Sequence, residues 1–103
     1  MKVKISFLER FKEPLLNGTK TMTTRSKRCG WKGDTFKAFG TTFQIEEVYI
    51  AALSWITKYR WKEEGCTSEE DFMNVWKSIH KKLNDPRSQW HVHKFKKVSE
   101  GDA

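Results

Sequence analysis

Short stretches in which apolar and polar residues alternate occupy the first half of the chain and its C-terminal end. Alternation of this kind is typical of strands that bury one face. The β-branched threonines before Arg25 favour the same structure. A Lys-Gly-Asp turn precedes the third of these stretches. The predicted strands are residues 3–7, 19–25, 35–39, 41–53 and 89–98.

The longest predicted strand changes the face on which its apolar residues lie. Phe43 and Ile45 share one parity, whereas Val48 and Ile50 share the other. One extra residue in a strand produces such a change, because side chains alternate between faces with a period of two. We therefore expect a β-bulge or a barrel corner at Glu46–Glu47.

Helical spacing replaces alternation in two parts of the chain. Apolar residues four apart predict a helix of a turn or two that ends at Asn17-Gly18, a left-handed stop. Pro14 should lie near its start, because proline removes a backbone donor and clashes with a preceding turn. A second helix is expected to be capped by Ser54 and to run to about Glu64, with Gly65 as its stop.

A third helix is predicted from a capping-box pattern at residues 67–70, which read Thr-Ser-Glu-Glu. An apolar stripe at helical spacing follows this pattern. Its members are Phe72, Val75, Trp76, Ile79 and Leu83. The Asn-Asp-Pro sequence at residues 84–86 should end the helix.

Strands on both sides of a helical middle predict an α+β protein. A small, curled, mainly antiparallel sheet or barrel is favoured over a parallel α/β sheet, since helices do not alternate regularly with strands. The 103 residues leave room for one domain. We expect it to span residues 1–98 and to be followed by a frayed polar tail at residues 99–103.

Charge adds the first indication of function. The chain has 20 Lys and Arg against 13 Asp and Glu, a net charge of +7 that attracts polyanions such as nucleic acid. The first 37 residues hold ten of the basic residues and three of the acids. This asymmetry predicts one basic face. The alternative is a charge that serves solubility and has no partner.

Cysteine usage and hydropathy bear on the compartment. Cys29 and Cys66 lie far apart and outside any Cys-x-x-Cys arrangement, so we interpret both as reduced thiols. No apolar stretch approaches the roughly 20 residues of a membrane span, and no signal-peptide pattern opens the chain. We expect a cytoplasmic monomer or weak dimer without a membrane partner.

One segment resembles a known family. Residues 16–25 read Leu-Asn-Gly-Thr-Lys-Thr-Met-Thr-Thr-Arg, similar to the signature of ASCH domains, small relatives of the PUA fold. Lys-Gly-Asp at residues 32–34 resembles the turn before the family's second barrel strand. Glu-Glu-Gly-Cys-Thr-Ser at residues 63–68, before Phe72 and Trp76, resembles its Glu-Gly turn and aromatic-bearing helix. The resemblance covers nearly the whole chain. It implies a small PUA-like β-barrel with two or three flanking helices and a cleft suited to RNA.

The resemblance also implies an activity. Small members of this family hydrolyse N(4)-acetylcytidine to cytidine and acetate with a Lys, a Thr and a Glu, and without a metal or another cofactor. Carried over by motif, these residues are Lys20, Thr23 and Glu64, and Arg25 completes the pattern. Amide hydrolysis needs a nucleophile, a base that activates it and an acid for the leaving amine. A lysine serves as the base when burial or nearby positive charge lowers its pKa.

Each of these residues also has a structural interpretation. Threonine fits a pleated strand, an isolated lysine is usually solvated, and Glu64 suits the polar end of a helix. Strict alternation places Lys20 on the opposite face from Thr23. The two side chains can meet only if the chain turns between them or the lysine stem curls round the strand edge.

Aromatic and basic residues after the motif are candidates for binding. Trp31 follows a Ser-Lys-Arg run and is expected to be an exposed ring that stacks on a base. The residues expected to contact substrate or RNA are Arg25, Thr21, Lys27, Arg28, Trp31 and Lys32. His91 and His93 share a strand face, but a zinc site needs a third and usually a fourth ligand, and no spacing recommends one. We predict no metal site and interpret these histidines as surface or RNA-facing residues.

The leading hypothesis is a metal-free amidohydrolase that acts on an acylated pyrimidine nucleoside. Thr23 would be the nucleophile, Lys20 the activating base, Glu64 the proton shuttle and Arg25 a substrate or oxyanion contact. A non-catalytic RNA-binding module that uses the same cleft is the first alternative. A ribonuclease is the second, with Lys20 and Arg25 stabilising a phosphorane.

Overall fold

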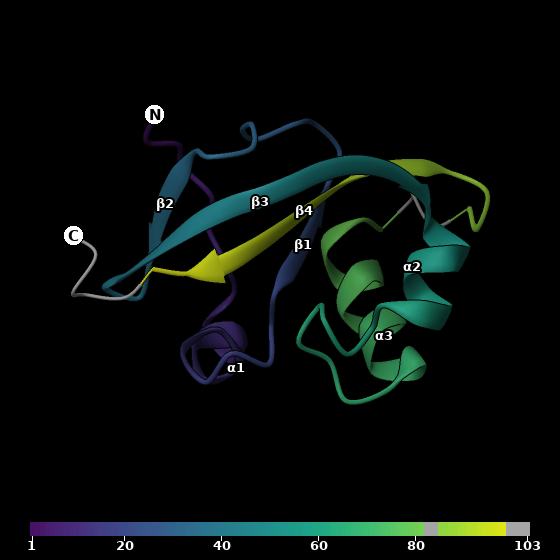
Figure 1. Cartoon of the computed structure of the whole chain (residues 1–103). Helices are drawn as coiled ribbons and strands as arrows, with labels where there is room; N and C mark the ends of the chain where they lie inside the picture. The colour runs from purple at the N-terminus through teal and green to yellow at the C-terminus, as the bar shows by residue number, and fades with distance from the viewer. Residues whose placement is uncertain (82–84, 99–103) are drawn as a thin grey trace.

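The computed structural model describes residues 1–81 and 85–98. Leu83, Asn84 and the predicted frayed tail at residues 99–103 lie outside the described residues. In chain order the elements are η1 (Glu9–Phe11), α1 (Lys12–Leu16), β1 (Met22–Arg25), β2 (Thr35–Ala38), β3 (Thr41–Ala52), α2 (Leu53–Tyr59), α3 (Glu69–Ile79) and β4 (Gln89–Lys97) (Figure 1). Among the described residues, no helix has the length and apolar character needed to cross a membrane.

The four strands form one curled antiparallel sheet in the order β1-β4-β3-β2. The long strand β3 arches over the molecule, and α2 and α3 lie together at its far end (Figure 1). The pairing of β3 with β4 shifts between Ile45 and Glu47, which confirms the bulge predicted at Glu46–Glu47. The α+β class with a curled, antiparallel sheet is confirmed.

The predicted N-terminal strand at residues 3–7 is wrong. Only Lys2 makes a bridge to the sheet, beside Thr35 at the outer edge of β2. The chain then leaves that edge, and the carbonyl oxygen of Ser6 accepts a hydrogen bond from Arg25 of β1 at 2.6 Å. The N-terminal segment therefore spans the opening between the two edge strands of the sheet. Its apolar alternation reflects the burial of Ile5 against the core rather than strand pairing.

The first helix is as short as predicted. Helix α1 has five residues, with Pro14 in its first turn, where backbone N–H groups have no partner within the helix. Gly18 has a φ of +84° and ends the turn that follows. The chain is thereby directed into the motif segment that leads to β1.

Helix α2 differs from the prediction at both ends. It begins at Leu53 without a side-chain cap, because the N–H groups of Leu53 and Ser54 donate to the carbonyl oxygens of Ser88 and Pro86. These bonds from the segment before β4 replace the cap expected from Ser54. The helix ends at Tyr59 rather than near Glu64. A turn then runs to Gly65, whose φ is +88°.

Helix α3 begins at Glu69, within the predicted capping-box pattern, and its N-cap is Ser68. The hydroxyl oxygen of Ser68 accepts the N–H of Asp71 at 3.0 Å, and the carboxylate of Asp71 accepts the N–H of Thr67. The capping acid is therefore Asp71 rather than a glutamate. Phe72 and Trp76 are buried on the side of the helix that faces the sheet.

Aromatic side chains fill the core in two groups. Phe36, Phe43 and Phe95 lie with ring centroids 5.2 to 5.5 Å apart under the curled sheet. Trp76 packs edge-on against Trp90 at 4.4 Å and fixes α3 on β4. Aromatic rings bury a large area per residue, so a sequence of low apolar content still fills its interior.

Candidate functional site

The motif segment and the turn after α2 are joined by backbone hydrogen bonds. The N–H groups of Thr21 and Met22 both donate to the carbonyl oxygen of Glu63, at 2.8 and 3.0 Å. This contact holds the turn against the start of β1, the edge strand. As a result Glu64 lies beside Lys20, although the two are 44 residues apart in the sequence.

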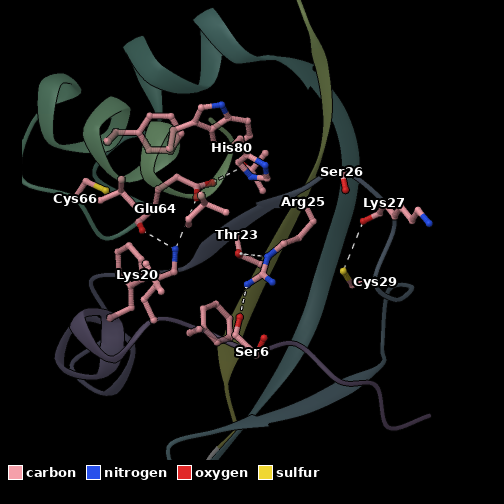
Figure 2. Close-up of a pocket in the computed structure, with 18 residues that line it drawn as sticks. Ser6, Lys20, Thr23, Arg25, Ser26, Lys27, Cys29, Glu64, Cys66 and His80 are labelled. Carbon is pink, nitrogen blue, oxygen red and sulfur yellow. Dashed lines mark hydrogen bonds and ion pairs between the residues drawn. The ribbon is translucent and has the colours of Figure 1, made fainter. Parts of the chain in front are cut away.

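A pocket of about 480 Å³ opens where these segments meet the N-terminal segment and α3 (Figure 2). Lys20, Thr23, Arg25 and Glu64 all line it, as does Lys27 at its rim. Aromatic rings form part of its wall. The rings of Phe7 and Phe11 come from one side, and those of Phe72 and Trp76 come from the other.

Lys20 lines the pocket and is only 4% exposed. Its Nζ donates to the carbonyl oxygens of Glu64 at 2.6 Å and Met22 at 2.8 Å, and lies 3.7 Å from Oε1 of Glu64. The ring of Phe11 is 4.5 Å from Nζ. Burial lowers the pKa of the Lys20 amine, although the Glu64 carboxylate opposes the shift.

Two neighbouring threonines of β1 have different partners. The hydroxyl of Thr24 donates to Oε2 of Glu64 at 2.7 Å. The hydroxyl oxygen of Thr23 instead accepts from Nε of Arg25 at 3.0 Å. The guanidinium of Arg25 lies 5.1 Å from the centre of the Phe7 ring. The Thr23 oxygen therefore faces a positive charge (Figure 2), and among the described residues no hydrogen bond has its hydroxyl as the donor.

Lys20 and Thr23 can reach the same pocket because Lys20 lies before the first residue of β1. Strand β1 starts at Met22, so Lys20 precedes it and is not bound by its alternation. The lysine stem folds along the turn at Gly65 and reaches the same pocket as Thr23. Among the hydrogen bonds of the described residues, none joins Nζ of Lys20 directly to the Thr23 hydroxyl.

The remaining predicted binding residues lie outside the pocket. Thr21 is not among the lining residues and takes part through its backbone. Arg28, Trp31 and Lys32 are exposed on the loop between β1 and β2. The guanidinium of Arg28 lies 4.1 Å from the centre of the Trp31 ring, which is 65% exposed. This loop continues from the pocket rim at Lys27.

Sequence reasoning missed several residues of the site. Thr24, which binds Glu64, was counted only as part of the motif. His80, at the end of α3, lines the pocket beside the Trp76 ring, and burial lowers its pKa. Cys66 also lines the pocket, and burial raises the pKa of its thiol to about 11. A thiol with such a pKa is a poor nucleophile at neutral pH.

The interpretation of the two β4 histidines as surface residues is wrong for His93, whose side chain is completely buried. His91 is half-buried. Both faces of this strand are covered along this stretch, so alternation gives no sign of exposure. Within residues 1–81 and 85–98, no group of three His, Cys, Asp or Glu side chains is placed to hold a metal ion.

Solved structures share this architecture. The hypothetical protein PH0355 superimposes with a TM-score of 0.73 at 14% identity, over 95% of this chain and all of that one. Protein EF3133 from Enterococcus faecalis V583 gives a TM-score of 0.62 at 15% identity, over 86% of this chain and 67% of its own. An ASCH domain from Lactobacillus crispatus JV V101 gives 0.57 at 10% identity, over 82% and 68% of the two chains. The chain has the fold of an ASCH domain.

The predicted PUA-like fold is thereby confirmed. No family model matches the chain, and no curated protein matches its sequence. The likeness is therefore one of fold, at identities of 10 to 15%. The assignment of the site within this fold is therefore based on the geometry of the pocket.

Proposed function

We propose that this ASCH-fold protein is a metal-free amidohydrolase that removes the acyl group from nucleosides of the N(4)-acetylcytidine type. One observation carries the proposal. Lys20, Thr23 and Glu64 come from two separate segments, yet they line a single pocket together with Arg25. A base, a hydroxyl nucleophile, a carboxylate and a fixed positive charge are the groups that amide hydrolysis requires.

The surroundings of Lys20 support its role as the base. Two of its N–H groups are held by the carbonyl oxygens of Met22 and Glu64. A neutral amine retains both of these bonds and has its lone pair directed elsewhere. Nζ of Lys20 lies 3.7 Å from Oε1 of Glu64, which is too long for a third hydrogen bond. Burial favours the neutral amine, because it lowers the pKa of Lys20.

The reaction proceeds through an ester on Thr23. The hydroxyl oxygen attacks the acyl carbon, and its proton passes to the Lys20 amine through one bridging water. Arg25 stabilises the negative charge that develops. Glu64 then relays this proton from Lys20 to the exocyclic nitrogen of the nucleobase. The C–N bond breaks, and the nucleoside leaves with a free amino group. Water then hydrolyses the ester, restoring the Thr23 hydroxyl and releasing the carboxylic acid.

The pocket walls support a nucleobase as the group that binds. A pocket of about 480 Å³ lies within the range of small-molecule sites, roughly 300 to 1,000 Å³. Aromatic rings from the N-terminal segment and from α3 flank it, and they offer faces for a planar base.

RNA binding without catalysis is the second candidate, and a separate observation favours it. Arg28 stacks on the exposed Trp31 ring in the loop that follows Lys27 of the pocket, and the chain has a net charge of +7. Exposed aromatic rings with cations are the usual platform for single-stranded bases.

The deciding experiment incubates the protein with N(4)-acetylcytidine and, separately, with short single-stranded RNAs. Release of cytidine and acetate is expected. Retention of RNA without turnover of the nucleoside would favour the binding module. Cleavage of the RNA would point to a ribonuclease, for which His80 is the pocket histidine.

A further inference from the structure

His93 is the most deeply buried polar side chain near the site. It lies on β4 directly across from Thr23 of β1 and has no exposed surface. Its Nε2 accepts the N–H of Cys29 at 2.8 Å. Its Nδ1 lies 3.3 Å from the carbonyl oxygen of Thr23. Both ring nitrogens are therefore occupied by backbone groups of the pocket.

These two partners determine the protonation state of the ring. A carbonyl oxygen only accepts, so Nδ1 must carry a proton, and Nε2 must be bare because it faces an N–H. Only the neutral Nδ1–H tautomer makes both bonds. Burial lowers the pKa of His93, and the hydrogen bond to the Thr23 carbonyl opposes this shift. The nearby Arg25, His91 and Arg28 lower the pKa further. The imidazolium would turn an N–H toward the Cys29 N–H.

The two backbone groups belong to different parts of the pocket. Thr23 carries the proposed nucleophile, and Cys29 lies on the loop that forms the rim with Lys27. We infer that His93 is a positioning residue that ties the strand bearing the Thr23 hydroxyl to this rim through one neutral imidazole. The inference rests on the proposed function, since it assigns His93 an effect on the Thr23 reaction.

The two bonds can be removed separately. In His93→Asn the amide nitrogen replaces Nδ1 and keeps the donor to Thr23, while the acceptor for Cys29 is lost. In His93→Gln the side-chain oxygen replaces Nε2 and keeps the acceptor, while the donor to Thr23 is lost. Asn should raise KM because the rim loosens, with kcat near that of the wild type. Gln should lower kcat on the order of tenfold or more, because small displacements of reacting groups slow catalysis steeply.

The control for stability is Phe43→Leu, a core change within the cluster of Phe36 and Phe95. It should weaken folding and leave kcat and KM unchanged at temperatures where the protein is folded. If both His93 variants alter kcat and KM no more than this control, the inference is overturned.

A measurement on the unmodified protein keeps the inference testable if variants fail to fold or the nucleoside is not hydrolysed. Long-range ¹H–¹⁵N spectra report which ring nitrogen carries the proton. The Nδ1–H tautomer should persist from about pH 8 to about pH 5, the range in which an exposed histidine titrates. An Nε2–H tautomer or an imidazolium near pH 6 would overturn the inference. Absence of hydrolysis together with the Nδ1–H tautomer would overturn the proposed function, and with it the effect of His93 on catalysis, while supporting the structural tie between Thr23 and Cys29.

Discussion

At the residue scale, the proposed role of Lys20 as a base depends on its burial. An exposed lysine is charged at neutral pH and cannot accept a proton. Here the amine is surrounded by Phe7, Phe11 and two backbone carbonyl oxygens. The two carbonyl oxygens accept hydrogen bonds from the amine in both its charged and its neutral form. Glu64 limits the shift of its pKa but does not reverse it.

This environment predicts the pH dependence of the reaction. In the proposed reaction the neutral amine is the active form, and the pKa of Lys20 lies below the ordinary value of 10.5. The rate kcat/KM should therefore rise with pH through a single pKa below 10.5 and then level off. A pH–rate profile with N(4)-acetylcytidine measures it. Lys20→Arg, which stays charged at all these pH values, should be inactive. A rate that falls as pH rises from 6 to 9, or an active Arg variant, would contradict the role of Lys20 as base.

The same burial predicts a cost in stability when the lysine is removed. Lys20→Met leaves two buried carbonyl oxygens without their donor and removes the amine beside the Glu64 carboxylate, and breaking such a set of buried polar contacts costs about 3 kcal/mol. Urea unfolding measures the loss, and the exposed Lys37→Met should change stability by less than about 0.5 kcal/mol. The double variant Lys20→Met with Glu64→Gln should recover part of the loss. If Lys20→Met is as stable as the wild type, the contacts of Lys20 with Glu64 and the two carbonyl oxygens do not contribute to the free energy of unfolding.

At the scale of elements, the sequence predicted best what depends on local chemistry. Gly18 ended a short helix, the parity change located the bulge at Glu46–Glu47, and β2, β3 and β4 lie close to their predicted ranges. The N-terminal strand failed because an extended segment that buries one side chain shows the same alternation as a paired strand. Helix α2 failed because its cap comes from residues near Pro86, a partner distant in the sequence.

The site was less predictable than the fold. The motif indicated Lys20, Thr23 and Glu64, but no spacing placed the Glu64 turn against β1, since this contact is made by backbone groups. The assumed start of β1 at Thr19 created a false conflict between Lys20 and Thr23. His93 was interpreted as a surface or RNA-facing residue because a histidine in an alternating strand looks the same whether it is solvated or enclosed on both faces.

The turn after α2 predicts a sensitive glycine. A Cβ on Gly65 would lie 3.0 to 3.2 Å from three carbons of the Lys20 stem, and its φ is +88°. Gly65→Ala should therefore displace Lys20 as well as strain the backbone. Gly40→Ala is the matched control, because its φ is +77° and nothing lies within 4 Å of the added carbon.

The two glycine variants separate strain from displacement. Each should lose about 1 kcal/mol of stability through the left-handed backbone. Gly65→Ala should lose more than this and should also lower kcat, whereas Gly40→Ala should keep its activity. Equal losses of stability with equal activity would show that the lysine stem does not depend on Gly65. Urea unfolding and the deacylation assay provide both values.

At the scale of the whole molecule, the chain carries an excess of positive charge. A free nucleoside is neutral and gains little from a field of +7. The exposed loop with Lys27, Arg28, Trp31 and Lys32 begins at the pocket rim. If the protein binds RNA, as the second candidate function proposes, this loop is the surface expected to contact the strand.

Such binding predicts a steep dependence on salt. With several phosphate contacts, affinity for a short single-stranded RNA should fall about tenfold or more for each threefold rise in salt. Trp31→Ala should weaken binding by about 1 to 3 kcal/mol and leave the salt slope unchanged, because stacking releases no counterions. Lys32→Gln should reduce the slope. Fluorescence titrations at several salt concentrations measure both, and an affinity independent of salt would exclude the basic loop as an RNA surface.

The central claim is that the Thr23 hydroxyl attacks the acyl group. The direct measurement compares the turnover of N(4)-acetylcytidine by the wild type, Thr23→Ala and Thr42→Ala. The last variant makes the same change on β3, at a residue that does not line the pocket. We predict that Thr23→Ala is folded and loses at least about a thousandfold in kcat, on the scale of removing a catalytic nucleophile. Thr42→Ala should match the wild type. A folded Thr23→Ala variant that deacetylates the nucleoside at the wild-type rate would contradict the account.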